Sequence, residues 1–400
     1  MKKPNYIFSL CIIGVLYFIF GFVTWLNSLL IPFLKTACSL SDSQAYFVTF
    51  AFYISYFVMA IPSSFILKKT GFANGMSIGL LVMAIGALGF IPAAYDRSYM
   101  LFLVSLFVMG TGLSLLQTAV NPYVSILGPI ESAAKRMSIM GLFNKIAGIV
   151  GILGLGAVLL SDYRDVAPAL LPQRLVTPYI IMAVALVGVA ITIKFAHLPQ
   201  VNTDETPTDH NSNRRSIYRI PHLWLGIAAL FLYVGVEVIA IDTLGLYAES
   251  QGIAKEVAPK LGAFSLVALT VGYIMGLVLV PKILAQDKAL LYSAVLGFVF
   301  AWLALATAGW TSVLFIILLS FAHAVMWPAI FPLSIDGLGR HTALGSAFLI
   351  MAIAGGAVMP LLYGWWVTCI NDRHLPYLIL LPCYLFIFYF ALRGHKAGRQ

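Results

Sequence analysis

The feature that most constrains this chain is a series of twelve long apolar stretches separated by short polar segments. Each stretch approaches the ~20 apolar residues that a helix needs to cross the hydrocarbon core of a bilayer. A single segment in lipid satisfies its own backbone hydrogen bonds only as a helix, so the pattern predicts an all-α membrane protein. The expected spans lie near residues 6–34, 42–66, 75–94, 99–124, 138–160, 177–197, 221–248, 259–282, 289–308, 312–335, 344–368 and 376–393.

The composition agrees with lipid as the main solvent. Apolar residues make up 61% of the 400 residues and charged residues only 10%, against about 25% charged residues in soluble domains. The net charge of +9 is explained by basic residues that flank membrane helices on the cytoplasmic side. The sequence has no basic run with interleaved aromatic residues, so we expect no nucleic-acid partner.

The basic residues also predict the orientation. An even number of spans puts both termini on the same side of the membrane. The face that carries the termini collects 16 of the 24 Lys and Arg residues, the opposite face holds 7, and Lys145 is left inside the membrane. Because cytoplasmic loops carry the excess of Lys and Arg, we expect a multi-pass protein of a bacterial cytoplasmic (inner) membrane with both termini in the cytoplasm.

A polar stretch divides the chain near its middle. Residues 198–220 are rich in Asp, Asn, Ser and Pro, which is typical of a solvated linker. This cytoplasmic linker separates an expected N-terminal six-helix bundle, residues 1–197, from a C-terminal one, residues 221–400. Two parallel six-helix repeats are the pattern of one large fold of secondary transporters.

Four ionisable residues lie at membrane depth, where such groups are costly and usually functional. They are Lys145, Glu237, Asp242 and His323. Glu237 fits a protonatable or cation-binding group, with a carboxylate that pairs to hold helices together as the alternative. We expect a Lys145–Glu237 pair that loosens during transport. At such a place His323 is more often a hydrogen-bonding core residue than a proton relay.

Helical geometry relates these residues to one another. Glu237 and Asp242 are about 140° apart on a regular helix, so they face one cavity only if the helix is broken. His323 and Trp327 are four residues apart and therefore share a helix face. The same geometry aligns neutral polar residues into two stripes, formed by Thr24, Asn27 and Ser28 on the first span and by Ser114, Gln117 and Asn121 on the fourth.

A polar stripe on an apolar helix faces a partner helix or an aqueous cavity rather than lipid. Helix packing is one explanation of the two stripes, and a sugar site is the other. Sugars offer hydroxyls for hydrogen bonds and an apolar ring face for aromatic contact, and polar groups placed to bind hydroxyls give specificity. The aromatic residues that accompany the amides and hydroxyls are Trp25, Tyr53, Phe143 and Trp327.

The sequence lacks the motifs of the common enzymes. It contains no H-E-x-x-H, no G-x-S-x-G and no G-x-x-x-x-G-K-[ST] pattern, so we expect neither catalytic residues nor a metal site nor a nucleotide site. Without a nucleotide site, transport would be driven by gradients. No cofactor is expected beyond a co-transported H+ or Na+.

Several segments of the chain have a familiar pattern. In the first half these are GFVTWLNSLLIPFLK, QAYFVTFAFYISYFVMAIPSSFILKKTGF and LLQTAVNPYVSILGPIESAAKR; in the second half they are VGVEVIA, MWPAIFPLSIDGLG and IAGGAVMPLLYG. These segments resemble the fucose and glucose/galactose symporter family of the major facilitator superfamily, and its glucose/galactose branch is the more similar. The resemblance covers nearly the whole chain, and the order of the segments makes it specific. It implies a twelve-helix fold with a central cavity and alternating access.

The resemblance also implies where this chain departs from the fucose branch. That branch has an Asp where this chain has Ser28 and a Glu where it has Gln117, whereas its amide on the fifth span persists as Asn144. Those carboxylates serve proton coupling and sugar binding in the fucose branch. Three alternatives stay open here: the titratable role has moved to Glu237, sodium replaces the proton, or coupling is absent.

The loop between the second and third spans carries Lys68, Lys69 and Gly71. In the superfamily such a basic cytoplasmic loop latches the two halves in one state through a carboxylate. A plain positive-inside anchor is the equally weighted alternative.

Together these observations predict a secondary active transporter that takes up a monosaccharide, glucose or galactose. Hydroxyls would be bound by Asn27, Ser28, Gln117, Asn121 and Asn144, and the ring face by Trp25, Tyr53 and Trp327. The coupling candidates are Glu237, Asp242, Lys145 and His323. We expect a monomer in the lipid bilayer. The alternatives are an uncoupled sugar uniporter, an efflux antiporter, and a membrane sugar receptor or scaffold that does not transport.

Overall fold

The computed structural model describes residues 6–126, 133–159, 168–196, 217–280, 283–338 and 342–398, apart from some side chains within these ranges, among them those of Lys68 and Asn121. Within these residues, twelve helical segments are long and apolar enough to cross a membrane, and they confirm the twelve expected spans with boundaries that differ by a few residues. The described part is helical and contains no strand.

The helices of the N-terminal half come first in the chain. They are α1 (Tyr6–Trp25), α2 (Asn27–Ala37), α3 (Asp42–Ala45), α4 (Phe47–Tyr95), α5 (Tyr99–Ile126), α6 (Ala133–Leu159) and α7 (Val176–Phe195). A 3₁₀ segment, Pro168–Leu175, precedes α7. Both the second and the third expected span lie in α4, which is interrupted at Gly71, where φ is 76° and ψ is 170°. Glycine tolerates this backbone conformation, which other residues avoid.

The C-terminal half contributes the remaining helices. They are α8 (Pro221–Asp242), α9 (Leu244–Ser250), α10 (Leu261–Leu279), α11 (Gln286–Ala306), α12 (Gly309–His323), α13 (Met326–Ile335), α14 (Thr342–Met351), α15 (Gly355–Ile370) and α16 (Leu380–Leu392). Of the expected linker, only residues 217–220 are described, and they form a short 3₁₀ turn, Ile217–Arg219. The division into residues 1–197 and 221–400 therefore stays a prediction.

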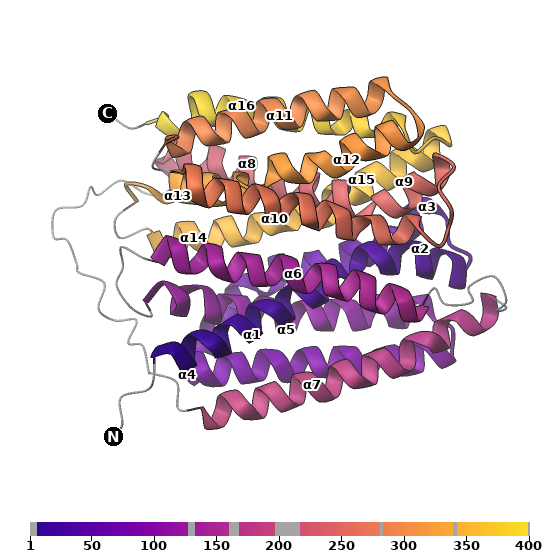
Figure 1. The fold of residues 1–400 in the computed structure, drawn as a ribbon. Helices are drawn as coiled ribbons and strands as arrows, with labels where there is room; N and C mark the ends of the chain where they lie inside the picture. The colour runs from indigo at the N-terminus through magenta and orange to yellow at the C-terminus, as the bar shows by residue number, and fades with distance from the viewer. Residues whose placement is uncertain are drawn as a thin grey trace.

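The helices run side by side along one common axis (Figure 1). Helices α1 and α4–α7 lie on one side and most helices of the second half on the other, and both chain termini lie at the same end. The halves meet where α6 packs against α10 and where α4 packs against α15. At the end away from the termini, α2 packs against α9, and α3 packs against α15.

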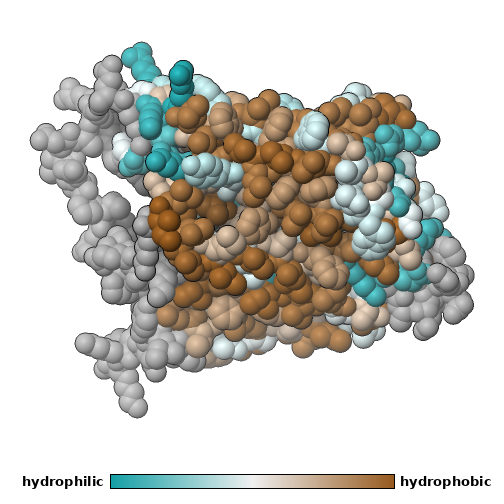
Figure 2. Space-filling model, turned by 45° about the horizontal axis from the view of Figure 1, so that its top comes forward, coloured by the Kyte–Doolittle hydropathy of each residue, from teal (hydrophilic) through white to brown (hydrophobic). Residues whose placement is uncertain are grey.

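The surface follows the same axis. On the face drawn in Figure 2, hydrophobic residues form a broad brown belt, with hydrophilic residues gathered at its ends. Large apolar side chains such as Ile85 and Val184 are more than 60% exposed in the structure. Such a surface is stable in lipid but not in water. The fold is therefore that of a multi-pass membrane protein.

Four of the expected spans contain an interruption of the regular helix. The first breaks between α1 and α2 at Leu26, the seventh at Thr243, and the tenth between His323 and Met326. In the eleventh span, a 3₁₀ turn at Ala352–Ala354 separates α14 from α15. Irregular backbone at membrane depth is tolerated where it is buried in protein or lines a cavity, and such breaks mark the binding sites of many transporters.

A close contact between two helices of the N-terminal half gives a first prediction. A Cβ atom added at Gly21 of α1 would lie 1.7 Å from the backbone oxygen of Asn144 on α6. Small residues allow membrane helices to approach in this way. We expect Gly21→Ala to push α1 away from α6 and to destabilise the protein by about 1–3 kcal/mol, the usual cost of overpacking.

The measurement is the thermal unfolding temperature of the purified protein in detergent. Gly154→Ala is the matched control, because an added Cβ at Gly154, also on α6, meets no atom within 4 Å. The control should unfold at the wild-type temperature or slightly above it, since alanine favours a helix. Equal temperatures for Gly21→Ala and wild type would contradict the assignment.

Candidate functional site

A polar cluster around Trp25 lies where the two halves meet. The indole Nε1 of Trp25 donates a hydrogen bond to Oδ1 of Asn144 at 3.1 Å. The ammonium of Lys145 lies over the same indole, 4.3 Å from the ring centroid, and 3.8 Å from Oε1 of Glu237. The structure thus contains the expected Lys145–Glu237 pair. That the pair loosens during transport stays a prediction.

This ion pair joins the halves at membrane depth, because Lys145 lies on α6 and Glu237 on α8. Each residue is only 8% exposed, so both charges lack the solvation that water would give them. At 3.8 Å the contact is longer than a hydrogen bond, and Oε1 of Glu237 has no hydrogen-bond partner among the described residues. The pair is therefore loose, which suits a contact that is broken and remade.

A second polar contact lies between α4 and α5. The amide Nε2 of Gln117 donates to the hydroxyl of Tyr56 at 2.8 Å. The ring of Tyr56 stacks on that of Tyr53, with centroids 6.2 Å apart. A Cβ added at Gly356 of α15 would lie 3.2 Å from the Tyr53 ring. Gln117 thus begins a chain of contacts that reaches the second half through two tyrosines.

The polar stripe of the first span lies at the junction between α1 and α2. The hydroxyl of Ser28 donates to the backbone oxygen of Trp25 at 2.9 Å, so its hydrogen is already engaged within the helix. Asn27 is 1% exposed, and within the described residues neither of its amide atoms has a partner. Asn27 therefore retains a donor and an acceptor. The side chain of Asn121, from the fourth-span stripe, lies outside the described residues.

The tenth span differs from the regular helix that the spacing of His323 and Trp327 assumed. It is interrupted between the two residues, yet both rings contact Tyr233, with centroids 6.1 Å and 6.5 Å from that of Tyr233. Nε2 of His323 is 2.7 Å from the hydroxyl of Tyr384. His323 is fully buried, and this contact matches a hydrogen-bonding core histidine better than a relay that reaches water.

Asp242 ends α8 at the break in the seventh span. Its Oδ2 accepts a hydrogen bond from Thr49 of α4 at 3.1 Å. The neighbouring Thr243 donates to the backbone oxygen of Ile239 and lies 2.7 Å from the hydroxyl of Tyr377. Glu237 and Asp242 therefore have different partners, as the angle between them on a regular helix requires.

Sequence reasoning missed a charged cluster at the end away from the termini. Nε and Nη2 of Arg373 donate to Oδ2 and Oδ1 of Asp42 at 3.1 Å and 2.9 Å. Lys35 donates to Oδ1 of the same carboxylate. Beside it, the rings of Tyr46 and Tyr363 meet edge to face with centroids 5.6 Å apart. We call Lys35, Asp42 and Arg373 the charge clamp.

The charge clamp links α3 of the first half to the segment after α15 of the second. Burial alone would lower the pKa of Arg373, but its hydrogen bonds with Asp42 and the attraction to that negative charge together raise its pKa above the usual value. The guanidinium therefore stays charged. One signal in the sequence was available: Lys35 and Arg373 are two of the seven basic residues expected on the face opposite the termini. In the fold Asp42 bonds both of them.

The basic loop between the second and third spans is only partly described. Gly71 has the left-handed backbone that a turn requires, and Lys69 is exposed. The side chain of Lys68 lies outside the described residues. The structure therefore leaves the latch and the anchor as alternatives.

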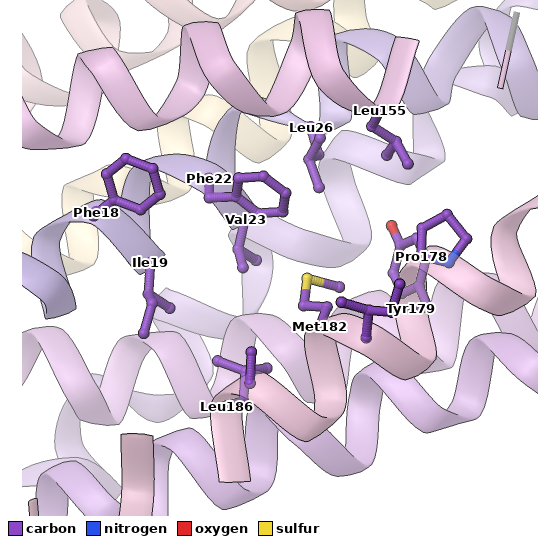
Figure 3. A pocket seen from close by; sticks show the side chains of 12 residues that line it. Phe18, Ile19, Phe22, Val23, Leu26, Leu155, Pro178, Tyr179, Met182 and Leu186 are labelled. Carbon is purple, nitrogen blue, oxygen red and sulfur yellow. The ribbon is translucent and has the colours of Figure 1, made fainter. Parts of the chain in front are cut away.

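An apolar pocket of about 250 Å³ lies apart from these polar groups (Figure 3). It is formed between α1, α6 and α7 by residues such as Phe22, Leu155 and Met182. None of the residues expected to bind sugar lines it. Its lining offers almost no hydrogen-bonding groups, so it does not fit a sugar.

Two halves of membrane helices that meet around a buried polar cluster, with spans broken beside that cluster, define a secondary transporter. The family profile described as Major Facilitator Superfamily matches residues 13–360. The chain belongs to this family.

Relatives cover almost all of the chain. It is 33% identical to the glucose/galactose transporter of Brucella abortus biovar 1 (strain 9-941) over 99% of this chain and 96% of the relative. It is 29% identical to the L-fucose-proton symporter of Escherichia coli (strain K12) over 98% of this chain and 94% of that one.

The solved structures agree with the fold. The structure of FucP, a Major Facilitator Superfamily transporter, in the outward conformation matches with a TM-score of 0.74 at 28% identity, over 96% of this chain and 98% of that one. The D-xylose-proton symporter matches with a TM-score of 0.70 at 15% identity, over 97% and 98%. The second likeness is evidence of fold alone.

Proposed function

We propose that this protein takes up a monosaccharide by alternating access and that protons entering with the sugar drive the uptake. The named relatives that span nearly the full chain transport glucose and galactose or carry fucose with a proton. The observation that carries the proposal is the buried polar cluster at the contact between the halves. Amides in a closed site, beside aromatic rings, suit sugar hydroxyls and an apolar ring face.

The sugar-binding residues on this proposal come from both halves. Asn27 has unpartnered amide atoms, Gln117 and Asn144 are half-buried, and Trp25 is held by Asn144. On the opposite side, Glu237 and Trp327 lie around Tyr233. A substrate between them would touch both halves, which is the requirement for coupling binding to alternating access.

We place the termini in the cytoplasm and the charge clamp on the outer side of a bacterial inner membrane, because the basic residues gather at the terminal end. In the structure the halves are joined at the charge clamp. On this orientation, the charge clamp closes the outer side. We propose that a single copy suffices for transport, since one chain supplies both sides of the buried polar cluster.

Proteoliposomes containing the purified protein test the function. Labelled glucose, galactose and fucose are offered with an inward proton gradient, an inward sodium gradient or neither. The proposal predicts accumulation of at least one of these sugars only with the proton gradient. Accumulation with the sodium gradient would show that sodium, and not the proton, is the coupled ion. Equilibration without accumulation would show that transport is uncoupled. Outward transport would indicate an efflux antiporter, and binding without flux would indicate a receptor.

Gln117→Ala tests the site. Its loss leaves a bound sugar hydroxyl without a partner, and an unpaired buried polar group costs about 1–3 kcal/mol. The hydroxyl of Tyr56 loses one donor but keeps its hydrogen bond with Thr24. We expect sugar uptake to fall about 10- to 100-fold at unchanged expression. Asn74→Ala is the control, because Asn74 bonds only within its own exposed turn. Normal uptake by Gln117→Ala would count against this site.

A further inference from the structure

Asp242 is the carboxylate whose surroundings are least suited to a charge. It is 0% exposed, and within the described part of the chain its single hydrogen-bond donor is the hydroxyl of Thr49. Its other oxygen, Oδ1, has no partner among the described residues. Within the same residues, Asp242 forms no ion pair, whereas Glu237 has Lys145 and Asp42 has Arg373 and Lys35.

The charged groups around Asp242 do not compensate for a negative charge. The titratable side chains that act on it or feel its charge are Glu237 on its own helix, Tyr46 between α3 and α4, and Tyr53 on α4. Tyr377 lies behind Thr243. These are acids, not bases. A buried carboxylate with neither a cation nor a second donor among the described residues is far more stable in such a place as the neutral acid.

The contact that buries Asp242 joins the two halves of the protein. Thr49 belongs to α4 and is fully buried, and Asp242 belongs to α8. Tyr46 lies within electrostatic reach of both Asp242 and Asp42, so Asp242 lies beneath the charge clamp. When the halves separate on the outer side, this contact must open and Asp242 must meet outside water.

We propose that Asp242 takes up the coupled proton and that the outer side closes only over its neutral form. The proposal rests on proton-driven sugar uptake and assigns its coupling residue. In the open state an O–H bond forms on the carboxylate with a proton from outside water. Closure then carries the proton inward with the sugar. The same O–H bond breaks on the inner side, and the proton passes to cytoplasmic water.

This assignment separates Asp242 from Glu237, the first candidate of the sequence. Glu237 already has a counter-ion across the interface, so it can remain charged while the halves are closed. Asp242 has none among the described residues. The two carboxylates then have different roles. Glu237 holds the halves together through Lys145, and Asp242 makes closure depend on a proton.

The decisive variant is Asp242→Asn, which keeps the shape of the side chain and can still accept from Thr49. An amide carries no exchangeable charge, so closure no longer requires a proton. In proteoliposomes with an outside pH one unit lower than inside, the wild type should accumulate sugar about tenfold, the ratio that one proton per sugar supports. Asp242→Asn should reach equal concentrations only, while sugar exchange between the two sides continues.

Closure itself is measured by the distance between spin labels at Ser43 and Ala254, two positions at the outer end of different halves, in protein whose other cysteines are replaced. The distance in wild type should lengthen as the pH rises, because the charged carboxylate keeps the outer side open. In Asp242→Asn the distance should not change with pH. Accumulation or a pH-dependent distance in this variant would overturn the proposal.

Two further variants test whether Asp242→Asn loses accumulation because it misfolds or because it lacks a titratable group. Thr49→Val removes the donor and keeps the carboxylate, so it should still accumulate sugar. Asp242→Glu keeps a titratable group on a longer side chain, so accumulation should persist with a displaced pH profile, and an unchanged profile would contradict the assignment. If wild type accumulates no sugar, proton-driven uptake itself fails. If wild type and Asp242→Asn accumulate equally, only the role of Asp242 fails.

Discussion

Glu237→Gln is expected to abolish sugar uptake and to lower the stability of the protein by about 3–5 kcal/mol, the usual cost of removing one partner of a buried ion pair. The variant would leave the ammonium of Lys145, 8% exposed, without its carboxylate. Lys145→Met would have a similar effect, because it leaves Glu237 alone at membrane depth. Either loss also removes a contact between α6 and α8.

The double variant Lys145→Met/Glu237→Gln distinguishes a pair from two independent residues. Replacing both partners of a buried pair is often neutral for stability, so thermal unfolding should return toward the wild-type temperature. The coupling energy comes from the double-mutant cycle. Asp96→Asn is the control, since Asp96 is exposed. If the two single effects simply add, the contact at 3.8 Å does not stabilise the closed state.

Arg373→Gln is expected to open the outer side. Arg373 supplies two hydrogen bonds to Asp42, and hydrogen bonds to charged groups contribute about 1.5–3 kcal/mol. The side chains are about one-fifth exposed, so water screens part of this energy, and we expect the closed population to fall about tenfold. The distance between labels at Ser43 and Ala254 should lengthen, and maximal uptake should fall with it.

The charge-swapped variant Asp42→Arg/Arg373→Asp tests whether attraction between the halves is the cause. It should recover part of the closed population. Recovery is incomplete because Lys35, which now bonds to Asp42, would face an arginine. Lys35→Gln should have a smaller effect than Arg373→Gln, since Lys35 and Asp42 belong to the same half. A wild-type distance in Arg373→Gln would show that apolar contacts such as Tyr46 with Tyr363 close this side without the clamp.

The sequence predicted the spans well but the roles of single side chains less well. Ser28 belonged to a polar stripe, yet its hydroxyl donates to the backbone of its own helix. The helix break at Leu26 is not visible in an apolar run, because it depends on how neighbouring helices support the freed backbone groups. The interruption between His323 and Met326 also lies in an apolar run and is likewise not visible in the sequence.

The sequence by itself determined the twelve spans and their expected orientation. Both depend on local quantities: the length of each apolar stretch, set by the thickness of the bilayer, and the number of basic residues in each loop. Neither requires knowledge of which helices are neighbours. The same is true of the short list of ionisable residues at membrane depth, which named Lys145, Glu237 and Asp242 before any contact was known.

Only the tertiary structure decided which of these residues meet. Lys145 with Glu237, Thr49 with Asp242, and Asp42 with Arg373 each join helices from different halves. The partner of a buried charge is chosen by the packing of distant segments, and its energy depends on distances of a few ångströms in a medium of low polarity. In the sequence, Glu237 and Asp242 are simply two carboxylic acids on the same span. Packing gave one a counter-ion and left the other with a single hydroxyl.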